Sequence, residues 1–117
     1  MARTGYQSYF DSDADNSAAA VKIKAGKIHL IEVSQVNNTD SFVQLFDLAT
    51  GDVTVGTTTP LQSYAIPPGD GTNIGAFDMN FGDRGLDFQT AITVAVTTAA
   101  ANSGDPTTGA VLNIVYE

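Results

Sequence analysis

Three aspartates in the segment DSDADN are the residues of this sequence whose spacing most suggests metal chemistry. Asp11, Asp13 and Asp15 occupy alternate positions, and clustered carboxylate oxygens suit hard cations such as Ca²⁺. An EF-hand loop beginning at Asp11 needs glycine at its sixth position and glutamate at its twelfth, where this sequence has Asn16 and Lys22. The specific motif therefore fails. We expect a solvated acidic segment and no cofactor, with a looser calcium site as the alternative.

Acid–base or nucleophilic catalysis would depend on His29, because it is the only histidine and the chain has no cysteine. Ser34 and Ser41 follow it in the sequence, but no Gly-x-Ser-x-Gly nucleophile elbow occurs. A glycoside hydrolase uses one pair of carboxyl groups for catalysis, but acidic residues scattered along a chain usually form solvated faces. The candidates for such a pair are Glu32, Asp78, Asp83 and Asp87. We predict that no catalytic site forms and that the protein is not an enzyme.

The length and charge of the chain limit its organisation and partners. With 117 residues, the chain has material for one core. Five basic against 13 acidic residues give a net charge of -8, which repels polyphosphate and argues against nucleic acid as a partner. The most apolar run, AITVAVTTAAA, is too short to span a bilayer, and the N-terminal segment has no apolar core typical of a secretion signal. We expect no membrane partner and synthesis in the cytoplasm.

Alternating apolar and polar residues predict strands along most of the chain. Segments rich in Gly, Pro, Asn and Asp separate these strands at a spacing of roughly ten residues, which is typical of a sandwich or jelly roll. We therefore predict an all-β fold: a single antiparallel β-sandwich or jelly roll in residues 18–117, with an extended N-terminal arm in residues 1–17. About eight strands are expected, at 21–24, 27–36, 41–48, 52–55, 61–66, 76–81, 91–98 and 110–117.

The apolar sides of these expected strands predict the core. The residues expected to supply much of it are Ile28, Leu30, Val33, Val43, Leu45, Ile66, Ile92, Val94, Val96, Leu112 and Ile114.

Residues 20–117 resemble the small virion proteins of tailed bacteriophages. The resemblance lies in the order of three motifs, AAAVKIKAGKIHLIEVSQVNNT, FVQLFDLATGDVTVGTTTPLQSYAIPPGDG and LDFQTAITVAVTTAAANSGDPTTGAVLNIVYE. It implies a β-sandwich or jelly roll located in the virion after synthesis in the host cytoplasm. Its implied role is that of a capsid decoration (cement) protein that binds the major capsid protein or other virion proteins and has no catalytic residues. The DSDADN segment and the NFGDRG loop depart from this pattern.

Other roles and an assembly state follow from the same residues. A tail or head-fibre component is one alternative, and a carbohydrate-binding or adhesin module is another. Because the chain has no tryptophan, a sugar-stacking platform in such a module would have to use tyrosines such as Tyr64 or Tyr116. Many sheet edges and no disulfides lead us to expect a homo-oligomer, specifically a trimer.

The N-terminal arm carries the predicted interface. Tyr6, Tyr9 and Phe10 fall within five positions of an otherwise polar segment, and such aromatic residues are costly to leave in water. We expect them to dock on a neighbouring subunit or on the capsid, because aromatic side chains contribute large contact areas at interfaces. The alternative is that they cover the domain's own sheet.

Overall fold

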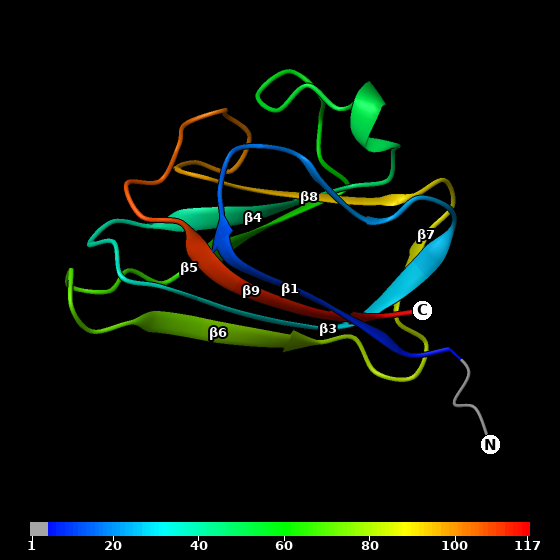
Figure 1. Cartoon of the computed structure of the whole chain (residues 1–117), viewed down its shortest axis with the longest axis horizontal. Helices are drawn as coiled ribbons and strands as arrows, with labels where there is room; N and C mark the ends of the chain where they lie inside the picture. Colours follow the sequence, from blue (N-terminus) through cyan, green and yellow to red (C-terminus); the bar gives the residue numbers. More distant parts are fainter. Residues whose placement is uncertain (1–4) are drawn as a thin grey trace.

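The structure is a computed structural model that describes residues 5–117 as two antiparallel β-sheets packed face to face (Figure 1). One sheet, here the β1 sheet, has the order β1-β9-β3-β6, with the short β7 also paired to β3; the other, the β2 sheet, has the order β2-β8-β4-β5. No described residues form a helix long and apolar enough to cross a membrane. The elements are β1 (Gln7–Ala14), β2 (Ala19–Lys22), β3 (Gly26–Gln35), β4 (Ser41–Phe46), the 3-10 helix η1 (Thr50–Asp52), β5 (Gln62–Ile66), β6 (Gly75–Asn80), β7 (Leu86–Phe88), β8 (Ile92–Thr97) and β9 (Ala110–Tyr116).

The strands pair in a nested order that identifies the fold. β1 pairs with β9, β2 with β8, β3 with β6, and β4 with β5. Two further pairings, β3 with β9 and β4 with β8, close these pairs into the two sheets. This is the strand order of a jelly roll. The predictions of an all-β chain and of an antiparallel sandwich are confirmed.

The core lies between the two sheets and contains ten of the eleven predicted residues. Leu30 is the exception, because the register of β3 against β9 shifts between Ile28 and Leu30. This irregularity turns Leu30 to the half-exposed side. Ile31 takes the core position instead and is 0% exposed. The prediction for Leu30 is therefore wrong, because a shift of one residue moves a side chain to the other face of a sheet.

Two strands lie where the sequence pattern predicted none. Residues 7–14 of the expected arm form β1, although we expected 1–17 to lack strand structure; residues 1–4 lie outside the described residues. A bulge between Asp11 and Ala14 breaks the alternation that would have revealed this strand. The sequence pattern also did not predict the short strand β7.

The expected strand at 52–55 does not form. Its first residue ends η1, and Thr54 accepts backbone hydrogen bonds from the amides of Thr57 and Thr58 at 2.9 and 2.8 Å. The side chain of Thr58 accepts a hydrogen bond from the amide of Thr54 at 2.9 Å. Because local turn bonds occupy these backbone groups, the alternating DVTV segment does not pair with a neighbouring strand.

The outer face of the β2 sheet is covered by two long loops. In Figure 1, the green loop with η1 and the orange loop before β9 lie above β4 and β8. Gln44 on this face is fully buried, and its amide donates to the Thr97 hydroxyl at 2.6 Å and to the Asn102 carbonyl at 3.0 Å. The Thr93 hydroxyl donates to the Leu48 carbonyl at 2.7 Å. These two loops thus have a structural role as the cover of this sheet.

Asp47, the last residue of the QLFD motif, ties the end of β4 to the segment before β8. Its carboxylate accepts hydrogen bonds from the backbone amides of Gln89, Thr90 and Ala91 at 3.0, 2.8 and 3.4 Å. Partial burial acts to raise the pKa of Asp47, but the three amides outweigh it and lower that pKa below its ordinary value. The ionised carboxylate therefore stabilises this corner of the roll.

The core assignment predicts that Val94→Asp lowers the free energy of unfolding by about 3 kcal/mol or more, because it places an unpaired charge in the core. Val94 is 2% exposed and lies on β8. Urea denaturation measures the change. Ile23→Asp is the control, since Ile23 is 84% exposed and should change stability by less than about 0.5 kcal/mol. Equal stability of the Val94→Asp variant and the wild type would contradict the assignment.

The hydrogen bonds of Asp47 predict that Asp47→Ala lowers the free energy of unfolding at pH 7 by about 2 kcal/mol. Because the folded-state pKa of Asp47 is lowered, its contribution is present above its ordinary pKa and is lost as the pH falls through the folded value. The difference between variant and wild type should therefore shrink in acid, as measured by denaturation at a series of pH values. The control is Asp52→Ala, at an exposed position in η1, which should change the free energy of unfolding at pH 7 by less than about 0.5 kcal/mol.

Candidate interaction surface

The outer face of the β1 sheet is the counterpart of the loop-covered face, and no described segment covers it. We call it the open face; it is formed by the outward side chains of β1, β9, β3 and β6. Phe10 is 63% exposed and Val111 is 39% exposed on this face. A broad, partly apolar sheet face left exposed in a monomer is typical of an interaction site.

The strand registers align the outward side chains of the open face in rows. In the central row, Phe10 lies opposite Asn113, Asn113 opposite Glu32, and Glu32 opposite Asp78. This row runs from β1 across β9 and β3 to β6. On either side of it lie the rows Ser8, Val115, Leu30 and Asn80, and Val111, Ser34 and Ala76. The row thus has an aromatic ring at one end and two carboxylates at the other.

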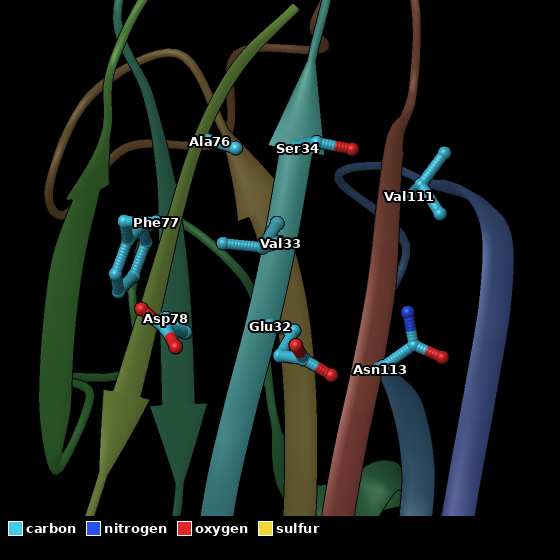
Figure 2. A pocket seen from close by; sticks show the side chains of 8 residues that line it. All are labelled: Glu32, Val33, Ser34, Ala76, Phe77, Asp78, Val111 and Asn113. Carbon is cyan, nitrogen blue, oxygen red and sulfur yellow. The ribbon is translucent and has the colours of Figure 1, made fainter.

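A hollow of about 360 Å³ lies along this part of the sheet. Figure 2 shows that Glu32 and Asn113 project to one side of the sheet, whereas Phe77 projects to the other. The residues that line the hollow come from β3, β6 and β9: Glu32, Val33, Ser34, Ala76, Phe77, Asp78, Val111 and Asn113.

The two carboxylates of the central row have no cationic partner among residues 5–117. The ion pairs of this region are Lys27 with Asp87 at 3.8 Å and His29 with Glu117 at 2.7 Å. Glu32 and Asp78 take part in neither pair, and both are exposed. Like charges directly opposite each other on neighbouring strands destabilise a sheet. The open face therefore carries uncompensated negative charge on β3 and β6.

The three aromatic residues predicted as an interface point in different directions. Phe10 projects from the open face, whereas Tyr9 is half-buried and packs against the core. Burial raises the pKa of Tyr9, and the neighbouring charge of Asp11 adds to that rise. The ring of Tyr6 lies edge-on to His29, with 4.7 Å between ring centroids. The alternative that these aromatics cover the domain's own sheet thus describes Tyr9, while Phe10 is free for a partner.

His29 is held by two acceptors and does not contact either candidate serine. Its Nδ1 lies 2.9 Å from the Gly82 carbonyl oxygen and its Nε2 lies 2.7 Å from Oε2 of Glu117. Both partner atoms accept, so the doubly protonated ring satisfies both. The bond to Gly82 raises the pKa of His29 above its ordinary value, against the lowering effect of burial, and the bond to Glu117 adds to the rise. The NFGDRG loop thus positions His29 through the Gly82 carbonyl.

The candidate serines are used elsewhere. Ser41 donates to the Gln35 side-chain oxygen at 2.6 Å in the interior, and Ser34 lies among the outward side chains of β3. The structure therefore does not bring a serine and a carboxylate together around His29 in the described chain.

The DSDADN carboxylates bond to nearby backbone. Asp11 accepts from the amide of Asp13, and Asp15 accepts from the amide of Ser17, both at 2.9 Å. Within residues 5–117, no group of three or more His, Cys, Asp or Glu side chains is arranged to hold a metal ion.

Two of the four candidate glycosidase carboxylates do come together, because Glu32 and Asp78 are directly opposite in the register. The other two lie apart from them, with Asp83 in the loop after β6 and Asp87 paired to Lys27. A glycosidase needs one carboxyl group kept protonated by its surroundings. Glu32 and Asp78 are both exposed on an open sheet, so their position suits recognition of a cation better than acid catalysis.

Comparisons with known proteins give no family assignment. No protein-family model matches the sequence, and no curated protein is significantly similar to it. Among solved structures, the coat protein of Tobacco streak virus is similar at 11% identity over 99% of this chain and 87% of that chain, with a TM-score of 0.37. The virus-like particle of the extra small virus of the giant freshwater prawn Macrobrachium rosenbergii contains a chain that is similar at 12% identity over 99% of this chain and 80% of that chain, with a TM-score of 0.38. At these identities and TM-scores neither likeness indicates function, and the fold assignment comes from the strand order.

The contacts of His29 predict a pH-dependent stability. Because its folded-state pKa is raised, the stabilisation is fully present below its unfolded pKa of about 6.5 and is lost as the pH rises through the folded value. The free energy of unfolding should therefore decline with rising pH in this range in the wild type. The slope should be smaller in His29→Gln, as measured by urea denaturation at several pH values. An unchanged slope in that variant would show that another group is responsible.

Proposed function

We propose that the chain is a non-enzymatic structural protein of a tailed-bacteriophage virion, specifically a capsid decoration (cement) protein that stabilises the head. The order of its three sequence motifs supports this family. The jelly roll is compatible with it, but the same fold also occurs in lectins and cupins, so the fold alone does not decide the function.

The observation that carries the proposal is the difference between the two outer faces of the sandwich. Loops cover the β2 sheet and bury even its polar Gln44, whereas the β1 sheet exposes Phe10 and Val111. A protein that attaches to a shell needs one surface to bind and another to face solvent. The open face is the surface we assign to attachment, with the major capsid protein or another virion protein as the partner.

Within the proposed interface, the three aromatic residues have different roles. Phe10 is the anchor that reaches the partner, because it is the most exposed of the three. Tyr9 holds β1 to the core from the opposite side. Tyr6 is 46% exposed and packs against His29 at the border of the face. This division places the attachment function on β1, a strand at the edge of the sheet.

We also propose a homotrimer formed through sheet edges rather than through the open face. Free edges are available at β1 and β6 in one sheet and at β2 and β5 in the other, and unpaired edges favour association. Pairing two open faces would bring four uncompensated carboxylates together, which like-charge repulsion opposes. Light scattering measures the mass, and the melting temperature should rise with protein concentration. A monomer mass with a concentration-independent melt would contradict the trimer.

A carbohydrate-binding module remains the second candidate, and one feature favours it. A hollow of about 280 Å³ between loops is lined by amide and hydroxyl side chains, including Asn38, Thr39 and Thr107. Tyr64 does not supply a stacking surface there, because it packs half-buried against the core near Phe81. A glycan array with saturable binding lost in Thr39→Ala, at unchanged stability, would favour this candidate over attachment to a capsid.

The decoration role predicts that the chain is found in purified particles of the phage that encodes it, by mass spectrometry. It also predicts that Phe10→Ser reduces binding to undecorated particles by at least about tenfold, because an exposed aromatic anchor is lost. Leu61→Ser is the control, since Leu61 is 44% exposed and lies directly before β5 of the other sheet. The proposal fails if the chain is absent from the particles.

A further inference from the structure

We propose that the open face recognises an arginine side chain of its protein partner, with the guanidinium placed between Glu32 and Asp78. This inference deepens the proposed function and rests on it only for the identity of the partner as a virion protein. The chemistry of the site comes from the strand register and the charges of the open face.

The register brings the two carboxylates into position for a shared cation. Glu32 on β3 lies directly opposite Asp78 on β6, and side chains in such positions have Cβ atoms about 5 Å apart. Each carboxylate repels the other, and neither is paired with a cation among the described residues. A cation bound between them would remove this repulsion and add two charge-assisted contacts. The pair therefore favours a positively charged group over a neutral one.

The shape of the guanidinium makes arginine the better occupant than lysine. Arginine presents five donors in a planar fork that matches carboxylate oxygens, whereas the lysine ammonium is a compact and strongly hydrated point charge. Asn113 lies next to Glu32 in the same row and lines the same hollow. It adds an amide oxygen beside the two carboxylates. Three acceptors on three neighbouring strands thus line one hollow.

The apolar side chains of the open face supply the surroundings that such a contact needs. Phe10 follows Asn113 in the central row, and Val111 lines the hollow. Apolar contacts around an arginine exclude water from its ion pairs and strengthen them. An arginine with apolar neighbours on the partner surface would therefore fit both parts of the face.

A second copy of this chain is a poor source of the arginine. The whole chain has 5 Lys and Arg residues against 13 Asp and Glu residues. Lys27 is already paired with Asp87 at 3.8 Å. Two chains that each carry a net charge of -8 also repel each other. A different, basic protein surface is thus the occupant that charge complementarity selects.

The test is an NMR titration of the full chain with a short peptide, acetyl-Gly-Arg-Gly-Arg-Gly-amide, at low salt. We expect amide shifts to concentrate at residues 30–34, 76–80 and 111–115. The matching lysine peptide should bind more weakly, the matching citrulline peptide should cause no shifts, and 0.5 M NaCl should weaken the arginine complex because salt screens exposed charges (~4 Å Debye length). Shifts spread over the whole acidic surface, or equal shifts with the citrulline peptide, would overturn the proposal.

Variants locate the binding site within the face. The double variant Glu32→Gln with Asp78→Asn should weaken binding of the arginine peptide by at least about tenfold. Asp52→Asn, which removes one exposed carboxylate from the loop-covered side, should leave binding unchanged. Equal affinity of the double variant and the wild type would overturn the site.

The same double variant controls for folding and separates this inference from the proposed function. Its melting temperature should equal or exceed that of the wild type, because the substitutions remove a like-charge pair. If the chain is missing from phage particles while the peptide still binds at residues 30–34 and 76–80, the proposed function fails and the arginine site stands. If the chain is present in particles but the peptide does not bind at this face, the arginine site fails alone.

Discussion

The insertion of β9 between β1 and β3 is the constraint on which the rest of this structure depends. β9 buries Leu112 and Ile114 in the core and turns Val111 and Asn113 outward. Without it, β1 would have no neighbour and the β1 sheet would be reduced to β3 with β6 and β7. The open face is therefore a product of pairings between segments about a hundred residues apart in the chain. Such non-local pairing makes folding slower than in proteins built from local contacts.

The two sheets differ in what covers their outer faces. The β2 sheet is covered by loops whose backbone carbonyls accept hydrogen bonds from Gln44 on β4 and Thr93 on β8, and Phe46 and Gln44 are fully buried. No described segment lies over the outer face of the β1 sheet, and the side chains of its central row are exposed. The small jelly roll therefore has one outer face that is covered by loops and one that exposes apolar and charged side chains.

Two polar ties, one at a strand of each sheet, hold loops of the roll, and their contributions to stability respond to pH in opposite directions. Asp47 uses its charge to bind three amides before β8, and His29 uses two ring N–H groups to join β3 to the NFGDRG loop and to Glu117. Gly82 in that loop has a φ of 72°, a conformation that favours glycine. One tie is strongest when its group has lost a proton and the other when its group has gained one. Both contributions are therefore fully present only between the ordinary pKa of Asp47 and the ordinary pKa of His29.

The sequence by itself determined the fold class, most strand positions and ten of the eleven assigned core residues, because a period of two along a strand is a local property. Tertiary structure decided the rest. β1 became visible only through its partner β9, since a bulge breaks its alternation, and Ile31 replaced Leu30 in the core because of a register shift against β9. The sequence also could not predict which side chains align in the central row, namely Phe10, Asn113, Glu32 and Asp78. These residues lie on four strands, and only the hydrogen-bond register between distant segments determines which side chains become neighbours.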